Sequence, residues 1–229
     1  NIFICHQTDI MGPKLLKPIL RKINRNYINQ FDFCWIPDTN QKINLSGNLS
    51  SFTNNRCFKI GPLSRFSKHK RKVIPNKYKF TALLSGPEPQ RSILESKIVN
   101  LFRQLPSECA IIQGKPLSKN HKEHNIDFFA HLSTDKFLDT INNSEIILCR
   151  SGYSNVMDFS ALGKKVIFIP TPGQTEQEYL ANYHSEASKV TSIRQSDISL
   201  EKINSKTSTV IQPSYDEELM NLAFEKAML

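Results

Sequence analysis

The sequence has no apolar run long enough to cross a membrane as a helix. Hydrophobic residues make up 39% of its 229 positions, and the longest uninterrupted apolar stretches, such as 146–149 and 166–169, have the length of strands. A membrane-spanning helix needs about 20 apolar residues. The length of the chain instead allows one large domain or two small ones.

Paired cysteines and metal-binding cysteine motifs are also missing. The five cysteines stand singly in mostly apolar surroundings, and none forms a CxxC or CxxH motif. Disulfide frameworks and structural zinc sites use such closely spaced cysteines. The pattern therefore predicts free thiols in a reducing compartment, which favours a cytoplasmic location, and it predicts no metal site.

Acidic residues are absent from two stretches that are rich in lysine and arginine. Residues 14–25 carry five basic residues and residues 65–79 carry seven, and the net charge of the chain is +9. Solvated faces and a basic linker would explain both stretches, whereas attraction to phosphates or to an acidic membrane surface would give them a function. Nucleic acid is not the expected partner, because no ribonucleoprotein motif, zinc finger or recognition-helix pattern accompanies the charge.

Strand-like and helix-like runs alternate along the chain. Strands are predicted near 2–5, 33–36, 57–60, 79–84, 109–112, 145–149 and 166–170, with shorter candidates at 128–132 and 191–194. Helices are predicted near 14–30, 89–104, 134–142, 154–162, 175–189 and 214–227. This alternation predicts an α/β fold with a Rossmann-like parallel sheet that has helices on both faces.

A basic stretch with two prolines, 61–77, interrupts the alternation and predicts a linker between two units. The first unit, 1–63, is too short for a complete domain, whereas the second, 64–229, has enough βα repeats to bury its own core. The final helix, 214–229, could pack on either unit. Because the chain has no Met at position 1 and enters directly on an apolar run, we expect it to be part of a longer protein.

The first candidate site lies within CRSGYSNVMDFSALGKKVIFIP, residues 149–170, where small and polar residues follow a strand. Ligands of open parallel sheets bind at the carboxyl ends of the strands, and the free amides of a helix start favour phosphate. Asp158, one turn into the helix, either accepts hydrogen bonds from ribose hydroxyls or favours the positive end of its own helix dipole. Together these features indicate a nucleotide site.

The helix of this site has clear start and stop signals. Ser154 or Asn155 can cap its start, and Gly163 fits the left-handed position just past its end. Lys164 and Lys165 are expected to favour the negative end of the helix dipole.

A second candidate site is LLSGPEPQR, residues 83–91, where a strand runs into Ser85 and Gly86 before a helix. A glycine lets the backbone approach a phosphate closely, and Pro89 suits the first helical position. The same turn could be pure architecture, and Glu88 could itself satisfy the amides of the helix start.

A third candidate site is PTPGQTEQEYLANYH, residues 170–184, in which a rigid loop precedes a helix. Side chains that both donate and accept hydrogen bonds suit the hydroxyls of a sugar. The alternative is a helix capped by Thr175, with Glu178 completing a capping box. The side chains that favour a sugar site are Gln174, Thr175, Glu176 and Gln177.

The 149–170 segment followed by GQTEQEYLAN resembles the donor-domain signature of glycosyltransferase family 28. IFICHQTDIMGPKLL and IGPLSR are similar to two further segments of that family, so the resemblance spans essentially the whole chain. It implies a GT-B fold, in which two Rossmann-like domains flank a cleft and the second holds a nucleotide-diphosphate sugar. The first Rossmann-like unit is then only partial in this chain.

The resemblance also implies site residues. The backbone amides of Ser154 and Asn155 would meet the donor diphosphate, Asp158 would bind the ribose, and Arg65 would lie near the phosphates. Glu176 and Gln177 fall near the residues that read the sugar. His6 matches a motif residue that is not the proposed base, so no catalytic base is assigned. The expected donor-binding residues are Arg65, Ser85, Gly86, Leu132, Arg150, Ser151, Gly152, Tyr153, Ser154, Asn155, Asp158, Gln174, Thr175, Glu176 and Gln177.

The activity that the resemblance implies is inverting, metal-independent hexosyl transfer in cell-envelope or polysaccharide synthesis, without a cofactor. The expected partners are a nucleotide-sugar donor, best matched by a UDP-sugar, an acceptor sugar or lipid-linked acceptor, and the inner face of a membrane. This part of the protein is expected to bind nucleotide but to be inactive alone. The alternatives are a nucleotide-sugar epimerase of the same fold and a non-catalytic donor-binding subunit of a two-chain enzyme.

Overall fold

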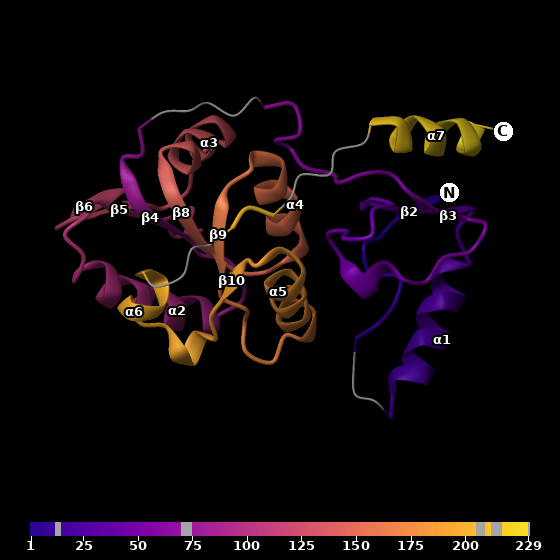
Figure 1. Ribbon diagram of the computed structural model, residues 1–229, viewed down its shortest axis with the longest axis horizontal. Coiled ribbons are helices and arrows are strands. Elements are labelled where there is room, and N and C mark those ends of the chain that lie inside the picture. Colours follow the sequence, from indigo (N-terminus) through magenta and orange to yellow (C-terminus); the bar gives the residue numbers. More distant parts are fainter. Residues whose placement is uncertain (12–14, 70–74, 205–208, 212–216, 229) are drawn as a thin grey trace.

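The computed structural model describes residues 1–11, 15–69, 75–204, 209–211 and 217–228, which form two α/β units. Figure 1 shows the smaller unit, which carries both chain ends, beside the larger one. Within these described ranges no helix is long and apolar enough to cross a membrane. All five cysteines are free thiols, as their spacing predicted.

The smaller unit is a three-stranded parallel sheet with a helix on each face. Its strands are β1 (Ile2–Ile4), β2 (Phe33–Ile36) and β3 (Cys57–Lys59), and they lie in that order. Helix α1 (Lys17–Ile28) packs Ile28 against one face of β2, whereas helix α7 (Glu217–Met228) packs Ala223 against Trp35 on the other. The last helix of the chain therefore belongs to the first unit.

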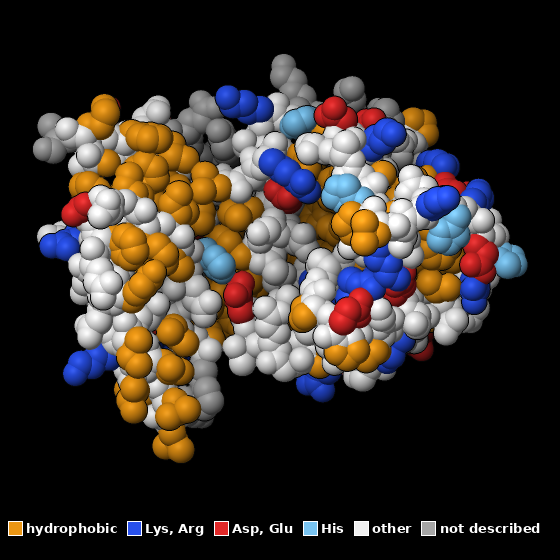
Figure 2. Space-filling view, turned by 180° about the vertical axis from the view of Figure 1, so that it is seen from behind, with side chains coloured by type: hydrophobic (Ala, Val, Ile, Leu, Met, Phe, Trp, Pro, Cys, Tyr) orange, Lys and Arg blue, Asp and Glu red, His pale blue; other side chains and the backbone are white. Residues whose placement is uncertain are grey.

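Large apolar side chains are exposed mainly on this smaller unit, where Figure 2 shows them gathered on one face. On β1, directly before α1 and along α1 they are Ile2, Ile4, Leu15, Leu16, Ile19, Ile23 and Tyr27.

The larger unit is a seven-stranded sheet in the order β10-β9-β8-β4-β5-β7-β6, parallel except for the edge strand β6. Its strands are β4 (Tyr78–Leu83), β5 (Cys109–Ile112), β6 (His121–Glu123), β7 (Ile126–Phe129), β8 (Ser144–Cys149), β9 (Lys165–Phe168) and β10 (Thr191–Ser192). Its helices are α2 (Gln90–Phe102), α3 (Thr134–Asn142), α4 (Tyr153–Leu162), α5 (Thr175–Ser188) and α6 (Leu200–Asn204).

Both faces of the larger sheet are buried. On the central strand β8, Ile147 and Cys149 pack in a core with α3, α4 and α5, whereas Ile146 and Leu148 pack in a second core with α2 and α6. Successive side chains of a strand point to opposite faces, so a strand covered on both sides is apolar throughout. The prediction of an α/β fold with helices on both faces of a parallel sheet is confirmed.

In the described part of the chain the predicted helices and strands are present, with ends that shift by a few residues, although 214–216 of the last predicted helix lie outside the described ranges. The short elements that were missed are β6, α6 and the 3-10 helices Gly47–Ser50 and Gln195–Asp197. Strand β6 has the polar sequence His-Lys-Glu and is partly exposed at the sheet edge, so it has no apolar pattern to reveal it. Helix α6 has only five residues. Of the predicted linker 61–77, the described residues contain no helix or strand, and the basic residues at 70–72 lie outside the described ranges.

Two expectations about helix ends can be compared with the structure. Gly163 does end α4 in the left-handed conformation, with φ of 57°. Lys164 does not stay at that helix end. Its buried ammonium group donates instead to the carbonyl groups of Asn142 and Ser144, at 2.9 Å each, while Lys165 begins β9. Lys164 thus completes the carboxyl end of α3 rather than that of α4.

The two units meet where α5 packs on the loop that follows β2. The carboxylate of Asp38, which is fully buried, shapes this loop by accepting hydrogen bonds from the amides of Thr39, Leu45 and Ser46. Hydrogen bonds then join the loop to α5 in three residue pairs, which are Asn48 with Tyr179, Asn44 with Tyr183 and Leu45 with His184.

His184 is the buried member of this contact. Its Nε2 donates to the carbonyl oxygen of Leu45 at 2.9 Å, and its Nδ1 has no partner among the described residues. Burial lowers the pKa of His184 to about 4, although Leu45 and the charge of Asp38 act in the opposite direction. The imidazole is therefore neutral in the folded chain at neutral pH.

The protonation of His184 predicts a pH-dependent stability. An unfolded histidine takes up its proton near pH 6.5, whereas folded His184 resists it until about pH 4. The contribution of this group is therefore intact above pH 6.5 and is lost as the pH falls toward 4, by roughly 3 kcal/mol. In urea unfolding between pH 4 and 7.5, His184→Gln should lose less stability than the wild type over this interval.

The matched control for that measurement is His121→Gln on the exposed edge strand β6, which should follow the wild-type pH profile. An identical profile for His184→Gln and the wild type would contradict the assignment.

Candidate functional site

The segment after β8 brings a glycine to the start of α4. Gly152 is the N-cap residue, with an extended backbone (φ −68°, ψ 147°), and no described side chain caps the helix. Ser154 and Asn155 were predicted as caps, which is wrong because they already lie in the first helical turn. The amide group of the Asn155 side chain instead donates to the carbonyl of Arg150 at 2.9 Å. A Cβ added at Gly152 would meet no atom within 4 Å.

Arg150 is one of the expected donor-binding residues, and the structure shows the direction of its side chain. Its side chain is 1% exposed and points into the protein. The guanidinium donates to the carbonyl oxygens of Ile169, Pro170 and Gln90 at 3.0–3.1 Å and to Oε1 of Gln195 at 2.7 Å. Burial lowers the pKa of Arg150 to about 10, so it remains a cation at neutral pH. Arg150 thus fixes the loops around the site instead of lining it.

The side chains of Ser151 and Gln177 are likewise buried and engaged. The Ser151 hydroxyl donates to the backbone carbonyl of Gln177 at 2.7 Å, and the Gln177 side chain accepts from the amide of Thr171 at 2.8 Å. In this arrangement the Ser151 hydroxyl and Oε1 of Gln177 are engaged within the chain. Both fasten the start of α4 to the start of α5.

Asp158 points toward the linker between the units. Its carboxylate accepts a hydrogen bond of 2.7 Å from the Ser64 hydroxyl and lies 3.4 Å from Nε of Arg65. Burial raises the pKa of Asp158, although Ser64 and Arg65 act in the opposite direction. The guanidinium of Arg65 also lies over the ring of Phe137, 4.8 Å from its centroid, and Leu132 packs against the same apolar cluster. The structure therefore brings the predicted residues Arg65 and Asp158 together, and Leu132 packs against the apolar cluster that contains Phe137.

The turn at Ser85 and Gly86 lies at the carboxyl end of β4, with φ of 101° at Gly86. Pro89 is the N-cap of α2, not its first helical residue. One alternative from the sequence was that Glu88 itself satisfies the amides of this helix start. The Glu88 carboxylate does accept a hydrogen bond of 3.1 Å from the amide of Ser92. This helix start is therefore already occupied by an anion of the chain.

The start of α5 also differs from the capping prediction. Gln174, which is exposed, is its N-cap residue, and Thr175 is the first helical residue. The hydroxyl of Thr175 lies 3.5 Å from the carbonyl oxygen of Met11, and Glu178 accepts from the amide of Gly173 at 2.9 Å. No capping box forms, since Thr175 lies one position too far along the chain.

A cavity of about 300 Å³ opens between the two units at the start of α4. It contains three of the predicted residues, Tyr153, Ser154 and Glu176. His6, from the loop after β1, joins them: its Nε2 lies 3.0 Å from Oε1 of Glu176, and its ring stacks on Tyr153. The complete lining is Ile4, Cys5, His6, Pro37, Leu63, Tyr153, Ser154, Met157 and Glu176.

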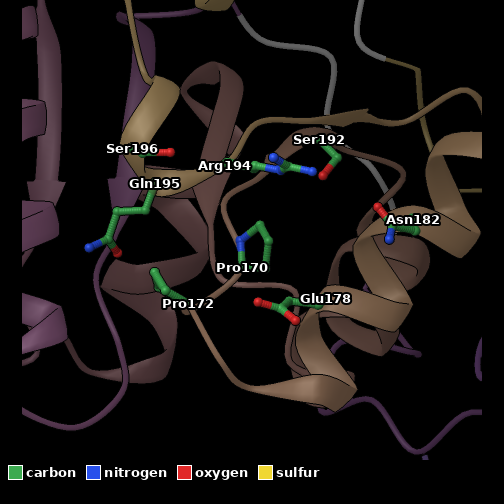
Figure 3. A pocket seen from close by; sticks show the side chains of 8 residues that line it. All are labelled: Pro170, Pro172, Glu178, Asn182, Ser192, Arg194, Gln195 and Ser196. Carbon is green, nitrogen blue, oxygen red and sulfur yellow. The ribbon is translucent and has the colours of Figure 1, made fainter.

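A second cavity, of about 380 Å³, lies between α5 and the segment after β10. Figure 3 shows Glu178 and Asn182 from α5 opposite Arg194 and Gln195. None of the predicted donor-binding residues lines it. Sequence reasoning missed this cavity because its polar residues are spread over two segments without a motif.

Comparison with known families gives the decisive observation. Residues 86–228 match the sequence model of the glycosyltransferase family 28 C-terminal domain, which is more than half of the chain. The chain belongs to this family. Its two α/β units have the GT-B architecture of the family 28 glycosyltransferases, so the resemblance stated from the sequence is confirmed.

Three individual proteins illustrate the relationship. The chain is 28% identical, over 135 residues, to the UDP-N-acetylglucosamine–N-acetylmuramyl-(pentapeptide) pyrophosphoryl-undecaprenol N-acetylglucosamine transferase of Pasteurella multocida, covering 55% of this chain and 37% of that protein. The solved glycotransferase of kitacinnamycin has 13% identity and a TM-score of 0.58, with 88% of this chain and 51% of that one covered. The UDP-GlcNAc 2-epimerase of Methanocaldococcus jannaschii has 14% identity and a TM-score of 0.55, with 93% and 65% covered.

This family 28 chain thus spans between 37% and 65% of the length of these proteins. The two solved structures share its fold.

The burial of Arg150 leads to a stability prediction for this family 28 chain. Arg150→Lys should lower the free energy of unfolding by about 3 kcal/mol, because one ammonium group cannot reach all four oxygens and leaves some of them unpaired. Chemical denaturation monitored by circular dichroism measures this change. The control is Arg103→Lys, which alters an exposed ion pair with Glu123 and should change the free energy of unfolding by less than about 1 kcal/mol. Equal losses in the two variants would contradict the role given to Arg150.

Proposed function

We propose that this chain binds the diphosphate of a nucleotide sugar at the amino end of α4. The observation that carries the proposal is the open start of that helix, where Gly152 caps without a side chain and the space beside it is empty. The first amides of a helix have no partner within the helix, and its dipole attracts anions. Tyr153 and Ser154, which supply such amides, line the cavity of about 300 Å³ between the units.

The other two helix starts support the choice of α4. At α2 the carboxylate of Glu88 already accepts from Ser92, and before α5 the carboxylate of Glu178 accepts from Gly173. A phosphate at the start of α2 would have to displace the Glu88 carboxylate, and a phosphate beside Gly173 would meet the Glu178 carboxylate. We therefore propose that Ser85, Gly86, Gln174 and Thr175 surround the site but do not bind the diphosphate.

The nucleoside is proposed to lie on the side of α4 that faces the linker. Asp158 there already accepts a hydrogen bond from a hydroxyl group, that of Ser64. A ribose hydroxyl can make the same bond after Ser64 moves aside. Arg65 would then compensate phosphate charge, and Leu132 would contact the base.

The proposed reaction of the whole protein is inverting transfer of a hexose from a UDP-sugar to an acceptor hydroxyl. The acceptor oxygen forms a bond to the anomeric carbon while the bond from that carbon to the diphosphate oxygen breaks, so UDP leaves with the bonding electron pair. The amides and dipole of α4 stabilise the developing charge on the leaving diphosphate without need of a metal. The proton of the acceptor passes to a base that we do not assign to any residue of this chain.

The name of the Pasteurella relative contains a pyrophosphoryl-undecaprenol acceptor, which supports the proposal of a lipid-linked acceptor and a role in cell-envelope synthesis. A location at the inner face of the membrane is part of the same proposal. Two alternative functions predict different reactions. An epimerase, whose fold this chain shares, would convert the nucleotide sugar itself, which product analysis with the full-length protein reveals. A donor-binding subunit would transfer sugar only with a second chain present.

The open helix start predicts opposite effects of one substitution on binding and on stability. In Gly152→Asp the new carboxylate can cap α4, so the free energy of unfolding should stay the same or rise by a few tenths of a kcal/mol. The same carboxylate occupies the proposed phosphate position, so affinity for UDP should fall more than about tenfold. Titration calorimetry with UDP and urea unfolding measure the two effects.

Gly152→Ala is the matched control. Its backbone conformation suits alanine and its Cβ meets no neighbour, so both affinity and stability should remain close to those of the wild type. Undiminished UDP binding by Gly152→Asp would exclude the amino end of α4 as the diphosphate site.

A further inference from the structure

Two cysteines lie side by side on neighbouring strands of the smaller unit. The parallel register of β2 and β3 places Cys34 directly opposite Cys57, and Trp35 opposite Phe58. Both cysteines belong to the apolar cluster under α1, whereas the two aromatic rings belong to the cluster under α7. Successive side chains of a strand point to opposite faces, so the two thiols share one face of the sheet. They are close enough for a hydrogen bond between them.

The spacing of the two strands suits a covalent bond between these sulfur atoms. Neighbouring strands lie about 4.7–4.9 Å apart. The Cα atoms of disulfide-bonded cysteines are usually about 4.4–6.8 Å apart, so β2 and β3 need no large movement to be joined. By contrast, Cys109 and Cys149 of the larger sheet have aliphatic or aromatic residues opposite them on both neighbouring strands.

The two thiols differ in access and in acidity. Cys34 is 1% exposed, whereas Cys57 is partly exposed and comes from β3, at one edge of the described three-stranded sheet. The hydrogen bond from Cys34 lowers the pKa of Cys57, although burial acts in the opposite direction. The same contact, together with burial, raises the pKa of Cys34. Because the thiolate is the reactive form of cysteine, Cys57 is the better nucleophile of the pair.

A third cysteine, Cys5, follows β1, but its thiol group is engaged elsewhere. Its Sγ donates to the carbonyl oxygen of Gln7 at 3.4 Å and accepts from the amide of Gln7 at 3.3 Å. Burial raises the pKa of Cys5, so its thiol is mostly protonated at neutral pH. Cys5 therefore serves as a comparison within the same unit.

We propose that Cys34 and Cys57 form an oxidation site, at which Cys57 reacts with a peroxide and Cys34 then closes a disulfide bond between β2 and β3. This inference is independent of the proposed donor site. The accessible thiol meets the oxidant, and the buried thiol lies where it can resolve the product.

The chemistry balances with one hydrogen peroxide for each pair of thiols. The Cys57 thiolate attacks one peroxide oxygen, so that an S–O bond forms, the O–O bond breaks and the leaving hydroxide takes up a proton to give water. The Cys34 sulfur loses its proton and attacks the sulfenic acid of Cys57, so that the S–S bond forms, the S–O bond breaks and a second water leaves. The two thiols give up two electrons, which reduce the peroxide.

The disulfide would join two segments that lead to the contact between the units. Strand β2 continues to Pro37, whose carbonyl accepts a hydrogen bond from the Tyr153 hydroxyl at 2.8 Å. Strand β3 continues to Gly61, whose amide donates to the carbonyl of Asp38 at 3.0 Å. Oxidation therefore fixes both segments where they leave the small sheet.

Simple packing of two small side chains makes a different prediction. Oxidation would then follow exposure alone, so that Cys34 would stay reduced while Cys57 accumulated as sulfenic acid and its further oxidation products. The fate of the buried Cys34 is therefore the quantity to measure.

The experiment treats the reduced chain with hydrogen peroxide and maps the cysteines by alkylation, proteolysis and mass spectrometry. The wild-type chain should yield a peptide pair joined through Cys34 and Cys57, and dithiothreitol should restore both thiols. In Cys34→Ser the sulfenic acid of Cys57 has no thiol beside it, so dimedone should trap it. In Cys57→Ser the oxidation of Cys34 should be slower by about tenfold or more, because its thiol is buried and protonated.

The matched controls are Cys109→Ser and Cys5→Ser, which should form the same disulfide at the wild-type rate. If Cys34→Ser proves unfolded by circular dichroism, Cys34→Ala takes its place with the same expectation. Oxidation of the wild-type chain without a bond between Cys34 and Cys57 overturns the inference. So does oxidation of Cys34 at equal rates in the wild type and in Cys57→Ser.

Discussion

A single buried cation, the guanidinium of Arg150, holds the loops around the candidate site in place. Its four hydrogen bonds go to oxygens at the end of β9, at the start of α2 and on Gln195, and none of them belongs to a carboxylate. Burying a charge is costly unless such polar groups surround it. If the three segments moved apart, the buried guanidinium would lose its hydrogen-bond partners. The start of α4 follows Arg150 directly and is therefore held next to these segments.

Much of the fold could be predicted because its signals are local. The run Ile146–Cys149 is apolar on both faces of a strand, and that pattern alone indicates a sheet covered by helices on both sides. The direction of Arg150 could not be predicted, since its partners Gln90 and Gln195 lie 60 and 45 residues away. A sequence motif places an arginine at a strand end, but distant residues decide whether it faces a ligand or the interior.

The candidate site, like the fold, was predicted from the sequence only where its signals are local. The helix start at 153 was predicted almost to the residue, yet the cap was assigned two or three positions too late, because small polar residues suit the cap and the first turn equally well. His6 and Glu176 are 170 positions apart, and their contact depends on how two units pack. The family resemblance located both segments without indicating that they touch.

The position of α7 has a consequence for how the two units can move. The chain passes from the first unit to the second before β4, and it returns after α6 to place α7 against Trp35. Two covalent connections between two bodies act as a double hinge: they permit bending about the line that joins them but oppose twisting and sliding. Any opening of the cleft would therefore have to keep both connections and the packing of α7 on Trp35.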